Sequence, residues 1–498
     1  MTNRILEVIK NKGLTYGQKV FTLASCAESM VSPVTLSESE QSYVNDKIIC
    51  TMYEGNAPYR PRYIIVDFEK FIKKGSKFLG LTPPSTLNEA LNYLLILYKH
   101  IPSITSLPVY IGNLDTLLEP FIKDEKEAEA AIRLFLIHID KTITDSFCHG
   151  NLGPAETKAG KIILKLTKEL NLAIPNLTLK VSASTSESLL SEAMDCAMHT
   201  AKPSFANDEM FRTDFKGDYA IASCYNGLKI GGGSHTLVRI VLSNLVKRAS
   251  STKDFLTVHL PDAVKNNCSI MDKRIRFLVE ESGFFQSSFL VKEKLINLDN
   301  FTAMFGMVGL AECVNTLLDK DAKTGRFGHD KSADELGLKI ISELASLVKQ
   351  HKAPYCKATD DSYVLHAQVG ISDDKGVSPG CRIPVGEEPE LFEHIMQSAP
   401  FHKYFPSGIG DIFVFDQTYK KTPKALIDIM KGSFSNGLRY ISFYSKDCDV
   451  VRISGYLVKR SEIEKLRKAE AVLNDATVLG KEAEENLHSM DRKIRKSR

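Results

Sequence analysis

No tryptophan occurs in the 498 residues, and none of the ten cysteines is spaced as a CxxC pair. The scattered cysteines therefore favour neither a zinc ribbon nor an iron–sulfur cluster, and we expect no bound metal. Apolar runs long enough to span a bilayer are also missing, and the first residues carry mixed charges and form no apolar signal core. These absences predict a cytoplasmic protein with buried, reduced thiols.

An excess of charge of one sign is missing too. Lysine and arginine number 64 and aspartate and glutamate 61, which leaves a formal net charge of only +3. No nucleic-acid or membrane partner is therefore expected. Hydrophobic residues make up 43% and charged residues 25%, as in ordinary globular proteins. The length favours several domains, or one large barrel with added helices.

Strand-like and helical segments alternate along the chain, which favours an α/β fold. Helices are predicted within residues 1–60 and at 91–98, 123–139 and 186–199, and short strands at 60–67, 108–113, 177–181 and 219–224. Loops are predicted at 148–154 and 202–209, and a glycine-rich turn at 231–235 is expected to open a helix that runs through residue 247. Beyond about residue 459 the composition predicts a charged, mostly helical tail.

Near the end of the chain, the apolar segment Val450–Val458 has a glycine, Gly455, at its centre. Glycine inside such a segment is costly unless the backbone requires it. One interpretation is a bulge or tight turn beside a core strand. The other is that Gly455 stores an unpaired electron on its α-carbon. The flanking amide nitrogen and carbonyl stabilise such a radical, and no Cβ prevents the carbon from becoming planar.

The sequence Arg452-Ile453-Ser454-Gly455-Tyr456 matches the signature Arg-(Ile/Val)-x-Gly-Tyr, and the chain therefore resembles the glycyl radical enzymes. Residues 203–208 (Pro-Ser-Phe-Ala-Asn-Asp) and 378–384 (Ser-Pro-Gly-Cys-Arg-Ile-Pro) resemble two further motifs of this family. The likeness extends from about residue 175 to residue 458, and within the family the chain is most similar to the YjjI group, which alone places the first 170 residues.

The resemblance implies a ten-stranded α/β barrel with peripheral helices, in which a glycine loop and a cysteine loop meet at the centre. On this basis we expect a mostly helical part at 1–170 packed on the barrel, and a barrel core at 171–430. Residues 431–498 would hold the glycyl radical loop and the helical tail. The resemblance also implies a radical on Gly455, formed after translation by a radical S-adenosylmethionine activating enzyme. A homodimer and a small-molecule substrate are expected as well.

A radical stored on glycine is too hindered to meet a substrate directly, so a cysteine thiol must relay it. Cys313 is the predicted relay, because its segment 305–316 is apolar and contains two glycines, which suits a loop inserted into the core. The alternative for Cys313 is a structural thiol near the start of a helix. The rival relays are Cys224, Cys381 and Cys448, for which ordinary packing is the preferred interpretation.

Many family members carry a glutamate two places after the relay cysteine. After Cys313 that place holds Asn315, and the nearby acid is Glu312, which is predicted to act in proton transfer if burial raises its pKa. Its alternative role is that of a carboxylate at a helix N-terminus. Two histidines, His149 and His235, are further acid–base candidates, although a lone histidine more often satisfies a local hydrogen bond.

The residues Gly232, Gly233 and Ser234 suggest a possible anion site at the start of the helix predicted after them, and a plain turn capped by Ser234 is the alternative. Three other functions stay open. An anaerobic ribonucleotide reductase would carry four zinc cysteines shortly before the glycine, where this chain has only Cys448. A formate acetyltransferase-like enzyme would use adjacent cysteines. A catalytically silent barrel would act as a binding protein.

Overall fold

The computed structural model describes residues 2–52, 54–105, 107–367, 376–478 and 490–496. The chain begins with three helices, α1 (Thr2–Lys10), α2 (Tyr16–Glu28) and α3 (Glu38–Asn45). Capping boxes fix the starts of α2 and α3. The sequence predicted helices up to residue 60. The helices end earlier, because β1 (Ile49–Cys50) already pairs with a core strand.

The first sheet has five strands, and the long strand β8 (Gly232–Val241) is the central one. Strands β9 (Phe301–Val308) and β10 (Val364–Ala367) continue it in parallel, and β1 and β2 (Tyr63–Ile65) pair antiparallel with β8. All residues of β8 and β9 are buried, as expected for the middle of a covered sheet.

The helix predicted from residue 235 through residue 247 is wrong up to residue 241, because that segment is strand β8, and helix begins only with α11 (Leu242–Leu245). The β-branched residues of β8 suit a strand, and its first glycines are required by close packing. A Cβ on Gly232 would lie 1.9 Å from the carbonyl oxygen of Asn300, and one on Gly233 would lie 2.0 Å from that of Tyr63. The glycines therefore let three strands approach one another.

The second sheet has six strands in the order β15-β11-β12-β5-β4-β3. Their bounds are β3 (His149–Leu152), β4 (Asn176–Val181), β5 (Ser204–Asn207), β11 (Asp411–Phe415), β12 (Tyr440–Ser445) and β15 (Ile494–Arg495). All neighbours are parallel except β5 and β12, which are antiparallel. The loops predicted at 148–154 and 202–209 thus contain strands, which pairing with β4 stabilises.

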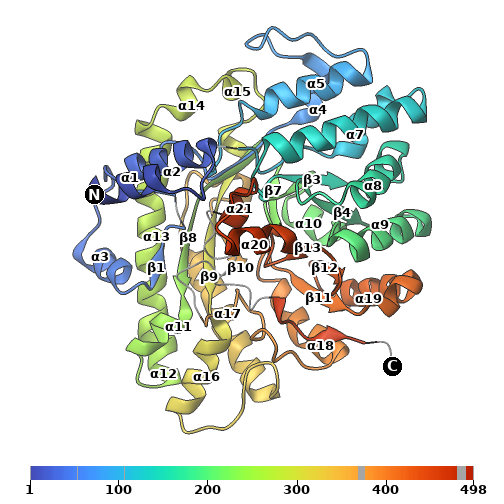
Figure 1. Cartoon of the computed structure of the whole chain (residues 1–498). Coiled ribbons are helices and arrows are strands. Elements are labelled where there is room, and N and C mark those ends of the chain that lie inside the picture. Colours follow the sequence, from blue (N-terminus) through green and yellow to red (C-terminus); the bar gives the residue numbers. More distant parts are fainter. Residues whose placement is uncertain (1, 53, 106, 368–375, 479–489, 497–498) are drawn as a thin grey trace.

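Helices surround both sheets (Figure 1). The larger ones are α5 (Leu87–Tyr98), α7 (Glu125–Thr142), α8 (Lys158–Leu170), α9 (Glu187–Thr200), α13 (Leu260–Arg276), α16 (Leu310–Lys320), α17 (Lys331–Gln350), α18 (Leu391–His402) and α19 (Pro423–Ser435). Shorter ones are α4 (Phe68–Lys74), α6 (Leu114–Leu118), α10 (Asp208–Asp214), α11 (Leu242–Leu245), α12 (Thr252–Asp254), α14 (Phe284–Ser287) and α15 (Phe289–Lys292). Among the described helices, none is both long and apolar enough to cross a bilayer.

The predicted α/β fold is confirmed. The ten-stranded barrel that the resemblance implies is not recorded as one closed ring, because the strands of the described ranges form two separate larger sheets. Strands from the first 170 residues belong to both sheets, and the predicted division into three parts stays a prediction.

Two small hairpins complete the fold. One consists of β6 (Tyr219–Ala222) and β7 (Asn226–Lys229), and the other of β13 (Val450–Arg452) and β14 (Leu457–Lys459). The second hairpin leads into α20 (Arg460–Arg467) and α21 (Asp475–Val478), which lie centrally in the view of Figure 1. The tip of each hairpin carries a residue that the sequence singled out for radical chemistry.

Candidate active site

Gly455 lies in the buried turn that joins β13 to β14. Its backbone φ does not fall in the left-handed region that favours glycine. Space is the physical reason for glycine here. A Cβ added to Gly455 would lie 2.1 Å from Cβ and 2.6 Å from Sγ of Cys224, which is closer than real Cβ atoms come to other atoms. The tips of the two hairpins therefore touch through Gly455 and Cys224.

Backbone contacts fix the position of Cys224 at the tip of the β6–β7 hairpin. Ser223 has a left-handed φ of 57°, and its N–H donates to the carbonyl of Val109 at 2.9 Å. The ring of His149 donates from Nδ1 to the Ser223 carbonyl at 2.6 Å, and the hydroxyl of Tyr440 donates to the Cys224 carbonyl at 3.2 Å. Hydrogen bonds to the carbonyls of Ser223 and Cys224 thus fix the backbone on both sides of the cysteine.

The Cys224 side chain is buried, and burial raises the pKa of its thiol to about 11. The group therefore keeps its proton at neutral pH. A protonated thiol can give up a hydrogen atom, whereas a nucleophilic cysteine needs a depressed pKa and a thiolate. The electrostatics of this site thus suit hydrogen-atom transfer better than nucleophilic catalysis.

A buried hydrogen-bond network holds the Gly455 carbonyl. That oxygen accepts from Nδ2 of Asn176 at 3.2 Å and from Nη1 of Arg452 at 3.4 Å. Arg452 also donates to Oδ1 of Asn176 at 3.0 Å and to the Ala201 carbonyl at 2.8 Å. The arginine of the signature is thus a structural anchor of the glycine turn, and Asn176 joins that turn to the six-stranded sheet.

Arg492 is a second anchor, from the tail that the sequence predicted to be charged and mostly helical. Its guanidinium donates to the carbonyls of Arg452 at 2.9 Å and Ile453 at 2.6 Å. The side chain is buried, and β15 begins two residues later. The predicted helix through the tail is interrupted, because this terminal segment is extended and adds to β11. Residues 479–489 lie outside the described ranges.

The remaining residues of the signature pack around the turn. Ile453 belongs to a buried apolar cluster, and the ring of Tyr456 packs edge-on against Phe147 with 6.0 Å between centroids. Ser454 is buried, and its hydroxyl has no hydrogen-bond partner within the described ranges. The turn is therefore shielded mainly by apolar and aromatic groups.

Cys313 lies in the first turn of α16, where the sequence predicted an inserted loop at 305–316. That loop is wrong, because residues up to Val308 form the buried strand β9 and the helix follows directly. Helix α16 packs against α11 and α17, and Cys313 is buried among apolar side chains. The three atoms nearest to an added Cβ at Gly455 all belong to Cys224, so the structure brings that cysteine, and not Cys313, to the glycine.

Glu312 also lies in the first turn of α16, and its carboxylate accepts from the N–H of Ser378 at 2.9 Å and from its hydroxyl at 2.6 Å. Burial raises the pKa of Glu312, and its second oxygen has no partner. These contacts join the helix start to the 378–384 motif. Its role in proton transfer stays a prediction.

The anion site predicted at Gly232, Gly233 and Ser234 has lost its physical basis, because these residues open a strand and not a helix. The Ser234 hydroxyl donates to the Thr236 carbonyl at 3.0 Å within the same strand. His235 is buried against Phe301, with 5.0 Å between ring centroids, and burial lowers its pKa to about 4. Neither arrangement suggests ligand binding.

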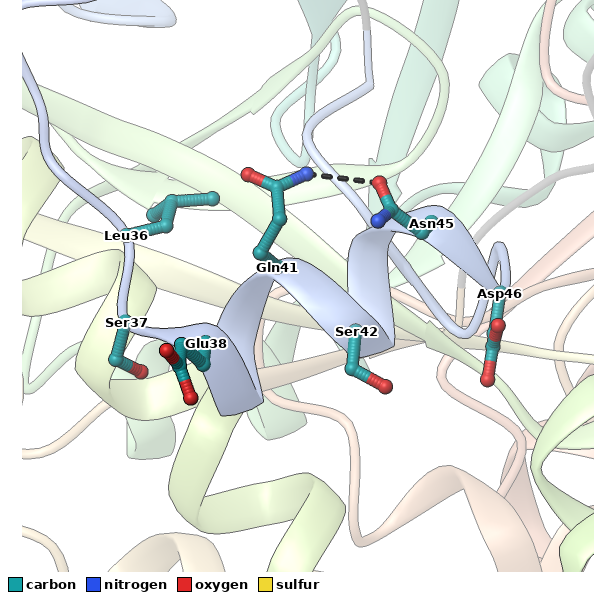
Figure 2. Close-up of a pocket in the computed structure, with 7 residues that line it drawn as sticks. All are labelled: Leu36, Ser37, Glu38, Gln41, Ser42, Asn45 and Asp46. Atoms are coloured by element: carbon teal, nitrogen blue, oxygen red, sulfur yellow. Dashed lines mark hydrogen bonds between the residues drawn. The ribbon is translucent and has the colours of Figure 1, made fainter.

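A shallow surface hollow lies along α3. Figure 2 shows its lining side chains, Leu36, Ser37, Glu38, Gln41, Ser42, Asn45 and Asp46, spread along the exposed side of the helix. Gln41 donates to Asn45 at 2.8 Å, and α3 lies at the edge of the molecule in Figure 1. Because it is open to solvent, this hollow does not suit a reactive radical.

The chain matches the model of the family described as "Glycyl radical enzyme YjjI-like" over residues 14–495. It belongs to this family of glycyl radical enzymes. An uncharacterised protein of Haemophilus influenzae is 47% identical, with 99% of this chain and 97% of that protein covered. The protein YjjI of Escherichia coli is 39% identical, with 99% and 96% covered.

Solved structures of other glycyl radical enzymes share the fold. An anaerobic ribonucleotide reductase from Thermotoga maritima aligns with a TM-score of 0.69 at 11% identity, covering 92% of this chain and 93% of that one. The B12-independent glycerol dehydratase of Clostridium butyricum aligns with a TM-score of 0.67 at 10% identity, covering 93% and 83%. At these identities the likeness extends to the fold alone, while the family model establishes that this YjjI-like chain is an enzyme of the glycyl radical class.

Sequence reasoning named Gly455 and its neighbours and preferred Cys313 as the relay, whereas the cysteine that contacts Gly455 in the structure is Cys224. It also missed Asn176 and Arg492. Cys224 lies between two short strands, at 219–222 and 226–229, and its place just after a strand-like segment was the available sign of a hairpin tip. No local pattern indicated that this tip would meet residue 455, because the contact joins parts of the chain more than 200 residues apart.

Proposed function

We propose that this YjjI-like protein stores a radical on Gly455 and relays it through Cys224 to a small substrate. The observation that carries the proposal is the contact between Gly455 and the Cys224 side chain. We prefer Cys224 to the relay Cys313 predicted from the sequence, since a hydrogen atom must pass directly between sulfur and the α-carbon.

The relay step is balanced without a further reactant. The S–H bond of Cys224 breaks, a C–H bond forms at Gly455, and the unpaired electron moves to sulfur. The thiyl radical then takes a hydrogen atom from a substrate C–H bond and becomes a thiol again. The pKa of about 11 favours this step, because the thiol holds its hydrogen at neutral pH.

The residue two places after Cys224 is Asn226, not the glutamate that many dehydratases of the family carry. Its side-chain oxygen is buried without a hydrogen-bond partner. No cysteine adjoins Cys224 either, as it would in a formate acetyltransferase. These two differences argue against the dehydratase and formate acetyltransferase reactions for this chain.

Activation requires a partner that removes a hydrogen atom from Gly455. A radical S-adenosylmethionine enzyme is the kind of partner that glycyl radical enzymes use, and we propose one here. It must first reach a glycine that is buried by its own turn and by Arg492. The expected cytoplasmic location and homodimer remain predictions.

The proposal is tested by electron paramagnetic resonance after anaerobic incubation with the activating enzyme, S-adenosylmethionine and a one-electron reductant. We expect a doublet, because one hydrogen remains on the radical carbon. Air should then cut the chain at Gly455, since oxygen adds to the carbon radical and the peroxyl adduct fragments the backbone. Gly455→Ala should give neither result. Absence of both the doublet and the cleavage with a competent activating enzyme would refute the proposal.

A further inference from the structure

Arg382 has a buried guanidinium whose hydrogen-bond donors are mostly unused. Its Nε donates to the Gly410 carbonyl at 2.8 Å, but Nη1 and Nη2 are buried and have no hydrogen-bond partner among the residues that the structure describes. Guanidinium groups do not lose their proton in proteins, so these donors stay charged. A buried donor left unpaired is destabilising by about 1–3 kcal/mol, and more when charged, so such a group calls for a ligand.

This guanidinium lies beside the cysteine hairpin. Its Cζ is 5.8 Å from the ring centroid of Tyr225, which follows Cys224 in the chain. Gly410, whose carbonyl accepts from Arg382, also lies against the hairpin, since a Cβ on Gly410 would lie 3.5 Å from the Tyr225 ring. Burial raises the pKa of Cys224, and the charges of Arg452 and Arg382 oppose that rise, which places both cations within electrostatic range of the thiol.

A small pocket includes Arg382 in its lining, together with the charged residues Arg492, Glu388 and Asp411. The two acids are already engaged. Asp411 is 3.1 Å from His402, and Glu388 accepts from the N–H groups of Gly386 and Lys493.

Arg492 is engaged as well, through the two carbonyls of the glycine turn. Its charge lies near that of Arg382, and this repulsion helps burial to lower the pKa of Arg492. Arg382 is thus the charged side chain of this lining whose donors remain free for a ligand.

The loop that carries Arg382 is held in place by the rest of the 378–384 motif. Glu312 accepts two hydrogen bonds from Ser378, and Gly380, with a φ of 53°, lets the chain pass close to Ala367. These contacts fix the position of the loop that carries Arg382.

We propose that Arg382 binds an oxyanion of the substrate, a carboxylate or a phosphate, and so holds the substrate beside Cys224. The planar fork of a guanidinium matches such groups with two parallel hydrogen bonds. The substrate class is therefore a small carboxylic acid or phosphate ester whose reacting C–H bond lies on the cysteine side of its anionic group. This inference rests on the proposed function of Gly455 and Cys224.

Binding is tested on the full chain before activation, so that it does not depend on the radical. The midpoint of thermal unfolding is measured with sodium acetate, inorganic phosphate, neutral acetamide, and sodium chloride at the same ionic strength. We expect acetate or phosphate to raise the midpoint, and acetamide and chloride not to. A response to acetate alone indicates a carboxylate substrate, and one to phosphate alone indicates a phosphate ester.

Three variants decide whether Arg382 is responsible. Arg382→Met should weaken the oxyanion affinity by about tenfold or more, because a charge-assisted pair is lost, and Arg382→Lys should retain part of it. Arg439→Met is the matched control, since Arg439 is also buried over a ring but pairs with Asp214. Its response should equal that of the wild type.

Equal responses in wild type and Arg382→Met, or no oxyanion effect in the wild type, would overturn the inference. The radical signal is measured on the same variants as a separate readout. A doublet in all of them with no oxyanion effect would refute the binding site and leave the proposed function intact. Oxyanion binding that depends on Arg382, without a doublet in any variant, would support the binding site and refute the proposed radical function.

Discussion

At the scale of single residues, the contact between positions 455 and 224 accounts for the glycine by space and not by backbone conformation. An alanine at 455 would place its methyl group 2.1 Å from Cβ of Cys224, so the cysteine hairpin would have to move. Gly455→Ala therefore alters the radical carbon and the relay geometry together. Variants of the cysteines are needed to separate these two roles.

We expect Cys224→Ala to form the glycyl radical but to lose the exchange of its hydrogen with solvent. Activation needs only Gly455 and the activating enzyme, whereas exchange needs a thiol that passes hydrogen to and from the glycine. In deuterated buffer the wild-type doublet should collapse, as deuterium from the thiol replaces the α-hydrogen. Electron paramagnetic resonance checks this directly.

Cys313→Ala is the matched control, because both thiols are buried but only Cys224 contacts Gly455. Its doublet should collapse in deuterated buffer as in the wild type. If the signal instead collapses in Cys224→Ala and persists in Cys313→Ala, the relay assigned from the sequence is restored.

The difference between these cysteines shows what a sequence can reveal about single residues. Gly455 was predictable, because its neighbours form a short signature with a chemical reason for glycine. Apolar neighbours made Cys313 look like a residue inserted into the core, and it is indeed buried, but in the first turn of a helix. Whether a buried thiol meets residue 455 depends on long-range pairing, which local composition does not encode.

At the scale of elements, long amphipathic helices such as α7 and α9 were predicted within a few residues. Short strands were the main errors. Strands β3 and β5 have only four residues each and contain His149, Asn151 and Asn207, so their local composition resembles a loop. They are strands because each pairs in parallel with β4, and that neighbour is distant in the sequence.

The terminal strand β15 and Arg492 form an element that secures the glycine turn. Arg492→Met would remove two hydrogen bonds to the carbonyls of Arg452 and Ile453. Because charged hydrogen bonds contribute about 1.5–3 kcal/mol, we expect local opening of the turn to become at least about tenfold more frequent. Hydrogen–deuterium exchange of residues 450–458 should accelerate, and the radical should form faster.

Lys493→Met is the control for this element, since Lys493 pairs with Glu390 and its side chain does not donate to the turn. Its exchange rates at 450–458 should stay at wild-type values. Unchanged exchange in Arg492→Met would mean that the turn is held by its own hairpin and by Asn176 alone.

At the scale of the whole molecule, two sheets and two hairpins enclose ionisable groups whose protonation is coupled to folding. Burial lowers the pKa of His149 to about 3, and the charges of Arg452 and Lys202 add to that effect. Two buried acids, Asp115 and Asp145, have pKa values raised to about 6 by burial. The two acids take up protons on folding, whereas the histidine releases one. The pH dependence of the stability of the whole chain therefore mixes opposite contributions.

A variant comparison isolates the histidine. The unfolded chain binds a proton at His149 below about pH 6.5, and the folded chain does not until about pH 3, so its stability falls as the pH drops through this range. His149→Gln removes that loss while an amide can still donate to the Ser223 carbonyl. At pH 8 the variant should be less stable, because the bonds of His149 to Ser223 and Thr178 are perturbed.

Below pH 6.5 the stability gap between wild type and His149→Gln should close by up to about 1.4 kcal/mol per pH unit. Denaturant unfolding at pH 5, 6, 7 and 8 measures the gap. His235→Gln should behave with the same sign, because burial also lowers the pKa of His235, to about 4. A gap that is constant with pH would mean that the folded protein binds a proton at His149 as readily as the unfolded chain does. Burial would then not lower the pKa of this histidine.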